Sequence, residues 1–456
     1  MINTFNRHVI QTLVALRSGS KHLRYLRLLK QTQFDPPDVI RARQWLAVRK
    51  LLKHAYYTVP FYRDRFSQLG LHPNDFTGPE DLERLPVLTK SDLRKHATRL
   101  RSDLYAEDEL MVKRTSGSTG VAVEVAIDRP SVEWKTACTI RSDEWSGWRL
   151  GGRIARLWGN PDYSHEHWRV RLRKRLVERT TYLDTLGVNE SRLRGFAERL
   201  RARRPSLLFG HAHSLYLLAC YVKKHVSNPC KPDGIISTAM LLHDYQRAAI
   251  EETFGCPVTN RYGCEEVSLI ACECEVHNGL HLNSDSLYTE VLREEHLGHT
   301  SDTGSLLVTD LTNFAMPIIR YKVGDVVVKT DRACPCGRGL PLIEKIEGRE
   351  ADYILAPGGK LISGISLTDH FATEIRGAAQ VQIVQESIDL IRIRMVPGDD
   401  FDDTSRAQLR DMVRKMFGKG MQHEVELVDQ IPQEPSGKYR FCISPVANDY
   451  LRSFAA

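Results

Sequence analysis

From about residue 110, short β-rich runs alternate with helical stretches, and this alternation constrains the fold more than any other feature of the chain. The β-rich runs are residues 121–127, 153–158, 207–209 and 234–237. The helical stretches are residues 131–145, 190–203, 213–224 and 244–254. Strands separated by helices of this length predict an α/β domain with parallel strands. Between residues 280 and 328 the pattern changes to consecutive strands.

Two flanking regions differ from this alternating part. Residues 41–66 have a strong 3.6-residue apolar period that is broken at Pro60, which predicts helices on both sides of the proline. Together with the polar capping residues that precede Leu82 and Leu93, this predicts a helical lead-in over about 1–105. After Gly348 the chain restarts with short strands, a strand pair near 381–395 and a helix around 405–416. We therefore expect a large domain over 1–347 and a small α+β domain over 348–456.

The composition of the chain disfavours some classes of binding partner. The net charge of +7 over 456 residues is modest, and its clusters at 169–179 and 199–204 indicate solvated helix faces rather than a nucleic-acid surface. No run approaches the roughly 20 apolar residues of a membrane span. Residues 1–31 carry apolar side chains at helical spacing, which predicts a helix packed on the body or lying on a surface. They lack the pattern of a signal peptide, so we expect a cytoplasmic protein.

Two segments carry groups that suit phosphate chemistry, although each alone has a plainer interpretation. Residues 114–120 are dense in glycine and hydroxyl side chains, so the backbone N–H groups of such a loop can surround phosphate oxygens; the alternative is an ordinary turn. In the second segment, Tyr262 and Gly263 can lie against a base and Glu266 can hold Mg²⁺; the alternative is a strand end with solvated acids.

Three further segments follow. Asp325, after a glycine, can accept the two hydroxyls of a ribose, or it can be a turn aspartate. Residues 348–352 read Gly-Arg-Glu-Ala-Asp, and residues 435–440 place Lys438 on a glycine-containing loop.

Together and in this order, the five segments resemble the motif series of the adenylate-forming superfamily, which includes acyl-CoA synthetases, peptide-synthetase adenylation domains and luciferases. Residues 55–63 (AYYTVPFYR) and 85–90 (LPVLTK) resemble the start of the phenylacetate-CoA ligase family, including its branch among capsular polysaccharide biosynthesis proteins. The resemblance runs from about residue 40 to the C-terminus. It implies a large N-terminal adenylate-forming domain with parallel-rich sheets and helices, and a small mobile C-terminal lid that carries Lys438.

The resemblance also implies the chemistry. A carboxylic acid would be activated by ATP and Mg²⁺ as an acyl-adenylate and then transferred to CoA by an acid–thiol ligase. Ser116, Gly117, Ser118, Thr119 and Gly120 would surround the β- and γ-phosphates. The remaining implied roles are Tyr262 with Gly263 for adenine, Glu266 for Mg²⁺, Asp325 and Arg349 for the ribose, and Lys438 for the α-phosphate and the carboxylate. In-line attack on the α-phosphorus brings anions together, and these groups would offset the repulsion.

Three positions depart from the usual pattern of this superfamily. No lysine follows Gly120, and Glu265 stands where threonine is common. Ala351 occupies the hinge position, where relatives usually have aspartate or lysine. Since this puts the thioester-forming step in question, the alternative is acyl transfer to an amine or a hydroxyl, by an amide or ester ligase in surface polysaccharide or secondary metabolite assembly.

Cysteine and histidine pairs indicate a metal site. Cys272 with Cys274, His277 with His281, and Cys334 with Cys336 offer soft ligands in two separated clusters, which favours tetrahedral Zn²⁺ over free thiols. By resemblance to zinc-containing relatives, the expected ligands are Cys274, His281, Cys334 and Cys336, with Cys272 and His277 as alternatives. Four protein ligands would make the zinc structural. A zinc-containing nucleic-acid-binding protein is disfavoured because the neighbourhood is acidic (Glu265, Glu266, Glu273 and Glu275).

The acid itself is expected to bind between the phosphate loop and Tyr262. The candidate lining segments are residues 157–160, 209–214 and 237–240, whose aromatic and apolar side chains suit an aryl or acyl group. His211 and His213 are interpreted as packing or hydrogen-bonding residues rather than catalytic bases. The expected partners are therefore a small-molecule carboxylic acid, ATP, and CoA or another acyl acceptor, without nucleic acid.

Overall fold

The computed structural model of the protein describes residues 6–115, 123–159, 179–185, 188–293, 302–347, 353–364, 367, 370–371, 374–398, 400–431 and 440–453. Its N-terminal part is helical: after a short π-helical segment, η1 (Asn6–Ile10), come α2 (Gln11–Ser18), α3 (His22–Thr32), α4 (Pro37–Thr58), α5 (Pro60–Gln68) and α6 (Lys90–Lys95). The predicted break at Pro60 is confirmed, because α4 ends at Thr58 and α5 begins at Pro60. Proline is tolerated there because the first N–H of a helix has no intrahelical partner.

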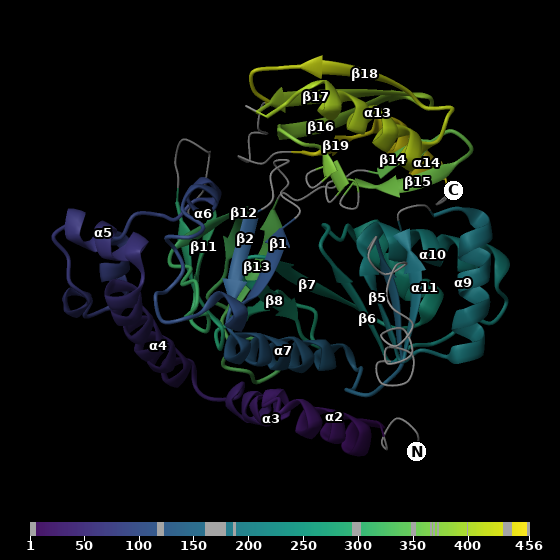
Figure 1. The fold of residues 1–456 in the computed structure, drawn as a ribbon. Coiled ribbons are helices and arrows are strands. Elements are labelled where there is room, and N and C mark those ends of the chain that lie inside the picture. Colours follow the sequence, from purple (N-terminus) through teal and green to yellow (C-terminus); the bar gives the residue numbers. More distant parts are fainter. Residues whose placement is uncertain are drawn as a thin grey trace.

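The first helices differ in how firmly they are packed. Helix α3 lies along α7 (Arg129–Asp143), where the rings of Tyr25 and Trp134 are 5.0 Å apart (Figure 1). Helix α2 buries only Ala15 and leaves Leu13 and Leu16 mostly exposed. Of the amphipathic segment predicted over residues 1–31, the second half therefore forms a helix that packs firmly on the body, namely α3. Among the described residues, no helix combines the length and the apolar character needed to cross a bilayer.

Among the described residues, eleven strands form the central sheet, in the order β10-β11-β12-β13-β9-β8-β7-β6-β5-β3-β4. Its parallel part consists of β3 (Ile154–Trp158), β4 (Thr180–Asp184), β5 (Leu207–His211), β6 (Gly234–Thr238) and β7 (Val258–Cys264). Its antiparallel part consists of β8 (Ser268–Glu273), β9 (Leu280–Leu282), β10 (Leu287–Leu292), β11 (Thr303–Asp310), β12 (Tyr321–Lys329) and β13 (Leu342–Glu347). The predicted α/β class is confirmed, and within the described part of this sheet the parallel pairs join only β3, β4, β5, β6 and β7.

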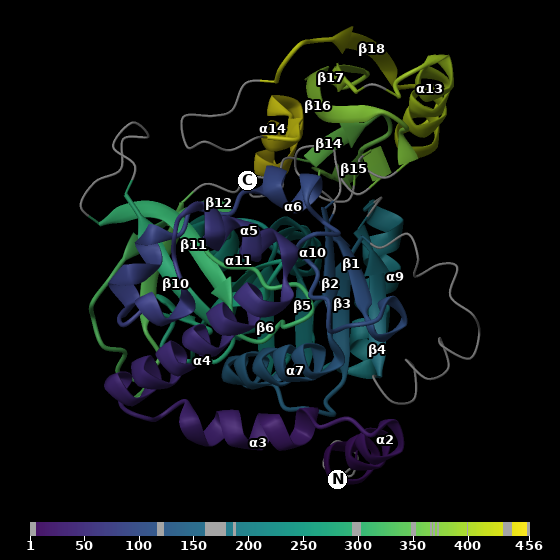
Figure 2. The same ribbon diagram turned by 60° about the vertical axis from the view of Figure 1, so that its left-hand side comes forward.

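Helices cover both faces of the parallel strands because alternate side chains point to opposite faces. Phe209 and Ile236 pack against Ile140 of α7. Their neighbours Leu208 and Ile235 pack with α9 (Glu190–Arg203), α10 (Ala212–His225) and α11 (Asp244–Phe254). Figures 1 and 2 show α7 on one side of the strands and these three helices on the other. A separate hairpin of β1 (Met111–Thr115) and β2 (Val123–Ile127) leads into α7.

The C-terminal part has its own sheet and core. Strands β16 (Ala378–Ser387) and β17 (Leu390–Pro397) pair antiparallel, with β18 (Gln422–Leu427) and β19 (Cys442–Ile443) at the edges. Helix α13 (Asp403–Phe417) packs on this sheet, as the pattern around 405–416 predicts. The part also contains the hairpin β14 (Tyr353–Ala356) and β15 (Lys360–Ser363) and the last helix, α14 (Pro445–Ser453).

Contacts join this C-terminal part to the helices beside the parallel strands, above which it lies in Figure 1. The hydroxyls of Tyr353 and Ser214 are 2.7 Å apart, and the backbones of Leu361 and Val188 form a bridge. The predicted domain boundary between residues 347 and 348 borders a segment, 348–352, that lies outside the described residues, so the boundary stays a prediction.

Candidate active site and metal centre

The hairpin between β7 and β8 carries the segment predicted to hold Mg²⁺ and adenine. Its strands pair from Arg261 opposite Cys272 to Cys264 opposite Ser268. Gly263 is required by packing, because a Cβ at this position would lie 2.4 Å from the carbonyl oxygen of Ser268. The two glutamates of the turn differ: Glu265 is exposed, whereas Glu266 is buried. Of the two carboxylates, only that of Glu266 is directed into the protein.

Glu266 lies where two other predicted segments meet. The Tyr321 hydroxyl donates to Glu266 Oε1 at 3.0 Å, and Lys90 Nζ lies 3.9 Å from the same oxygen. Backbone hydrogen bonds join Leu88 to Arg320 and Lys322, each at 2.9 Å. The segments at 85–90, 262–266 and 320–325, distant in sequence, are thus in direct contact. A buried carboxylate with hydroxyl and ammonium neighbours is a site where a hard cation and a phosphate can both be accommodated.

Tyr262 and Asp325 also meet in space. The Tyr262 hydroxyl donates to Asp325 Oδ2 at 2.5 Å, and both residues are buried. Three strands separate β7 from β12 in the sheet order, so this contact requires the antiparallel part of the sheet to curve strongly. The curvature brings the predicted adenine and ribose residues together.

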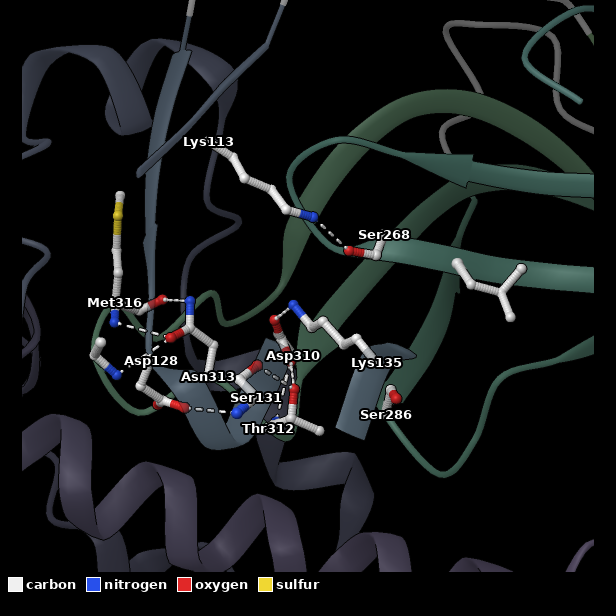
Figure 3. A network of polar contacts seen from close by, with 12 residues as sticks. Lys113, Asp128, Ser131, Lys135, Ser268, Ser286, Asp310, Thr312, Asn313 and Met316 are labelled. Atoms are coloured by element: carbon white, nitrogen blue, oxygen red, sulfur yellow. Dashed lines mark hydrogen bonds and ion pairs between the residues drawn. The ribbon is translucent and has the colours of Figure 1, made fainter. Parts of the chain in front are cut away.

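A buried polar network, not predicted from the sequence, anchors the β1–β2 hairpin (Figure 3). Lys113 of β1 donates to Ser268 Oγ at 3.1 Å, and Lys135 of α7 forms an ion pair with Asp310 at 2.5 Å. Burial lowers the pKa of Lys113, and the nearby Glu265 opposes that shift. Because β1 leads directly into residues 116–120, Lys113 connects the start of the predicted phosphate loop to the β7–β8 hairpin.

The same network continues through the first turn of α7 and the connection from β11 to β12. Asp128 caps α7 by accepting from the Ser131 N–H at 2.7 Å, and it also accepts from the Phe314 N–H at 3.0 Å. Asn313 donates to the carbonyl oxygens of Ala126 and Met316 (Figure 3). The hairpin whose two strands flank the predicted phosphate loop is therefore attached to the body of the sheet at several points.

The Lys135–Asp310 pair supports a stability prediction. Replacing Lys135 with methionine would leave a carboxylate that is fully buried without its counter-ion, so the free energy of unfolding should fall by about 3 kcal/mol. The matched control is Lys223→Met, which breaks an exposed pair with Glu252 and should cost about 0.5 kcal/mol or less. Urea unfolding measures both. If both variants lowered the free energy of unfolding by the same amount, the buried pair would not stabilise the protein more than the exposed one, which would contradict this prediction.

The predicted zinc ligands form one cluster. The ligand atoms of Cys274, His281, Cys334 and Cys336 all lie within 4.8 Å of one another. The sulfurs of Cys274 and Cys334 are 3.6 Å apart, and Cys336 Sγ is 3.3 Å from His281 Nε2. A tetrahedral zinc with Zn–S bonds of about 2.3 Å holds its sulfurs about 3.8 Å apart, so these separations suit zinc.

The orientation of His281 suits a metal as well. Its Nδ1 lies 3.1 Å from the carbonyl oxygen of Leu340, so that nitrogen donates and Nε2 faces the three sulfurs. The two alternative ligands lie elsewhere: Cys272 approaches the carbonyl of Ser142, and His277 contacts Glu273. The cluster ties the β8–β9 hairpin to the connection between β12 and β13. It therefore braces β12, which carries Asp325.

The candidate lining segments for the acid lie at the carboxyl ends of β3, β5 and β6, the edge at which open α/β sheets bind ligands. His213 Nδ1 is hydrogen-bonded to Gln246, as expected of a hydrogen-bonding residue. Several predicted positions lie outside the described residues: Ser116, Gly117, Ser118, Thr119, Gly120, Asn160, Arg349, Ala351 and Lys438. Their roles stay predictions.

Comparison with known proteins shows which proteins this chain resembles. Residues 354–445 match the family described as the CapK C-terminal domain. A phenylacetate-coenzyme A ligase of Thermus thermophilus is 27% identical over 336 residues, which cover 71% of this chain and 73% of the relative. Protein CapK of Staphylococcus aureus is 24% identical over 373 residues, covering 80% of this chain and 81% of CapK. The phenylacetate-coenzyme A ligase of Escherichia coli is 24% identical, covering 86% of this chain and 93% of the relative.

Solved structures show the same fold. A 2-hydroxyisobutyryl-CoA ligase in complex with 2-HIB-AMP and CoA, in its thioesterification state, matches with a TM-score of 0.61 at 20% identity, covering 92% of this chain and 93% of that chain. The same ligase in its postadenylation state matches with a TM-score of 0.57. The chain therefore has the fold of the adenylate-forming superfamily. Within that superfamily, its resemblance to the phenylacetate-CoA ligases and CapK is confirmed.

Proposed function

We propose that this chain is an AMP-forming ligase that activates a carboxylic acid with ATP as an acyl-adenylate and then transfers the acyl group to CoA. The observation that carries the proposal is the meeting of three distant segments around Glu266, Tyr262 and Asp325. The names of two of the three reported relatives support the same chemistry, since both are phenylacetate-coenzyme A ligases, and the 2-hydroxyisobutyryl-CoA ligase of the same fold is bound to an acyl-adenylate and CoA.

The nucleoside of ATP would lie beside the Tyr262–Asp325 pair. In this proposal the Tyr262 ring packs on adenine, the Asp325 carboxylate accepts the ribose hydroxyls, and Arg349 lies near the same ribose. Because Tyr262 donates to Asp325, the tyrosine also fixes the direction of the carboxylate. The base and sugar positions are then set by one contact between two buried residues.

The phosphates would lie between residues 116–120 and the β7–β8 turn. Glu266 would hold Mg²⁺, which offsets the charge of the phosphates while the acid's carboxylate oxygen attacks the α-phosphorus and pyrophosphate leaves. Lys90 and Tyr321 orient the Glu266 carboxylate. Lys438 would reach the α-phosphate and the attacking carboxylate. Lys113 adds a further ammonium group near the predicted phosphate loop, in which no lysine follows Gly120.

Asp325 gives the sharpest test of the nucleoside position. Asp325→Ala should lower kcat/KM for ATP by roughly 10- to 100-fold, because a charge-assisted hydrogen bond to the ribose is lost. The wild-type protein should discriminate against 2′-deoxy-ATP, and the variant should use the two nucleotides equally. Acid-dependent pyrophosphate exchange with each nucleotide measures this. A variant that keeps the discrimination would contradict the assignment.

The Cys274, His281, Cys334 and Cys336 cluster would hold a structural Zn²⁺. The donor set fits, with three sulfurs and one imidazole nitrogen in one cluster and the other imidazole nitrogen hydrogen-bonded to a backbone carbonyl. Four protein ligands fill a tetrahedral zinc and leave no position for water, so the metal would not take part in the reaction.

A second acceptor is favoured by one observation: residues 354–445 of the C-terminal part, which would form the lid, match the CapK C-terminal domain. Together with Ala351 at the expected hinge, this supports transfer of the acyl group to an amine or a hydroxyl, by an amide or ester ligase in surface polysaccharide or secondary metabolite assembly.

Trapping with hydroxylamine tests adenylation and then separates the two acceptors. A panel of carboxylic acids with ATP and Mg²⁺ should give an acyl-hydroxamate for at least one acid. For that acid, CoA should give a thioester and increase AMP release. AMP release that responds to an amine or a sugar, but not to CoA, would select the second acceptor. A folded protein that gives no hydroxamate with any acid would contradict both.

A further inference from the structure

The parallel strands have one topological switch point, between β3 and β5. Strand β3 pairs in parallel with both β4 and β5. From β3 the chain continues outward to β4, whereas from β5 it continues in the opposite direction to β6 and β7. Ligands of open α/β sheets bind outside the carboxyl ends of the strands at such a switch point.

The last residues of these two strands meet at that position. Trp158 ends β3 and His211 ends β5, and their rings are 4.2 Å apart and tilted by 41°. Thr238, the last residue of β6, is the register partner of His211. The next residue, Ala239, has φ of 68°, a left-handed conformation that is uncommon without glycine and that gathers at functional sites. The same edge of the sheet thus carries a half-buried tryptophan against a buried histidine, and a strained backbone.

The ring of His211 is buried, and its two nitrogens form no hydrogen bond with the described residues. The exposed fraction of this residue is 0%, and within the part of the chain that the structure describes neither Nδ1 nor Nε2 has a hydrogen-bond partner. Burial, reinforced by His213, lowers the pKa of His211 to about 3, so the imidazole is neutral at physiological pH. A neutral imidazole keeps one N–H donor and one bare nitrogen acceptor. Leaving both unmet in a buried position is unfavourable, and a ligand that meets one of them removes that cost.

The chemistry of the missing partner follows from these two nitrogens. A hydroxyl group fits either of them, because it accepts from the protonated nitrogen and donates to the bare one. A second carboxylate on the acid could only accept a hydrogen bond from the imidazole, and the neutral ring would not offset its negative charge. An ammonium group could only donate a hydrogen bond. The indole of Trp158 and the ring of Phe209, 5.7 Å from it, give the adjoining surface an apolar, aromatic character.

We propose that His211, at the end of β5 and beside the end of β3, recognises the acyl part of the substrate and selects an acid that carries a hydroxyl group on an otherwise apolar acyl chain or ring. This rests on the proposed function, since it names the class of acid that the ligase activates. His211 acts as a specificity-determining residue and takes no proton in the reaction.

Acids that differ by a single hydroxyl test the proposal. An aryl pair is 4-hydroxyphenylacetate and phenylacetate, and an aliphatic pair is 2-hydroxyisobutyrate and isobutyrate. In acid-dependent pyrophosphate exchange, the wild-type protein should prefer the hydroxylated member of at least one pair by about tenfold or more in kcat/KM. His211→Phe keeps an aromatic ring beside Trp158 without the nitrogens, and should bring that ratio close to one.

Two further variants distinguish a loss of hydroxyl recognition from a general loss of folding. His211→Gln offers a donor and an acceptor again and should restore part of the preference. His225→Phe, at the exposed end of α10, should leave the ratio unchanged. Thermal unfolding of each variant with and without the acids gives a readout of binding that does not need turnover, since a ligand that binds the folded state raises Tm.

The outcomes distinguish this inference from the proposed function. Exchange with several acids but no hydroxyl preference, or a preference that survives in His211→Phe, would overturn the inference and leave the ligase assignment in place. The protein could instead show no pyrophosphate exchange with any acid, while hydroxylated acids raise the Tm of the wild type but not of His211→Phe. This result would overturn the ligase assignment and support the acyl subsite. Neither exchange nor binding with any acid would overturn both.

Discussion

Replacing Glu266 with glutamine should lower acid-dependent pyrophosphate exchange by about 10²–10³-fold, the loss typical when one group that stabilises transition-state charge is removed. Glutamine keeps an oxygen that can accept from the Tyr321 hydroxyl, so the local packing is preserved while the negative charge is lost. Exchange measured over a range of Mg²⁺ concentrations should show a raised requirement for the metal.

The neighbouring glutamate provides the matched control for this variant. Glu265→Gln removes the same charge from the same turn, but its side chain is exposed, so exchange should stay within about threefold of the wild-type rate. A similar loss in both variants would mean that the turn contributes general negative charge rather than a directed ligand. An active Glu266→Gln protein would remove Glu266 from the proposed site.

Loss of the zinc cluster should have the largest effect on stability. The purified protein should contain one zinc per chain, and Cys334→Ser or a strong chelator should remove it and lower the free energy of unfolding by roughly 5 kcal/mol or more. The physical reason is that Cys334 and Cys336 hold the connection between β12 and β13 to Cys274 and His281. Metal analysis and thermal unfolding with and without added Zn²⁺ measure both effects.

Two nearby residues serve as controls for the zinc prediction. Cys272 and His277 belong to the same sequence pairs but make other contacts, so Cys272→Ala and His277→Ala should retain zinc. Protein that stays free of zinc after refolding with Zn²⁺, at unchanged stability, would contradict a structural metal. Zinc lost from Cys272→Ala would instead change the ligand set.

Much of the fold could be predicted because local sequence patterns determine it directly. Proline at position 60 ends one helix and begins the next, and the alternation of strands and helices gives the parallel part of the sheet. The paired cysteines and histidines predicted a candidate metal site because few residue types bind zinc, and the structure brings Cys274, His281, Cys334 and Cys336 into one cluster.

What could not be predicted depends on contacts between distant residues. The Tyr262–Asp325 hydrogen bond arises from curvature of the sheet over three intervening strands, which no local pattern encodes. Lys135 has no distinctive signal within its helix, because a lysine there usually faces solvent and only the tertiary fold sets Asp310 against it. Asp128 was within reach of prediction, since an aspartate before Arg-Pro-Ser is a typical helix cap.

Which of the two adjacent glutamates is buried could also be learned only from the structure. Glu265 and Glu266 are adjacent in a turn, and the sequence alone does not say which carboxylate faces inward. Pairing of Cys264 with Ser268 fixes the turn, exposes Glu265 and buries Glu266 against Tyr321. The departure from the usual threonine at position 265 therefore places the additional charge in solvent.

The most direct test of acyl-adenylate formation is ATP–pyrophosphate exchange across a panel of aryl, aliphatic and hydroxylated acids, with Lys438→Ala as the comparison. We expect exchange that requires both Mg²⁺ and one class of acid, and that falls by at least about 10²-fold in Lys438→Ala. A folded protein that binds ATP but shows no acid-dependent exchange, or whose exchange is unchanged in Lys438→Ala, would contradict the proposed adenylation.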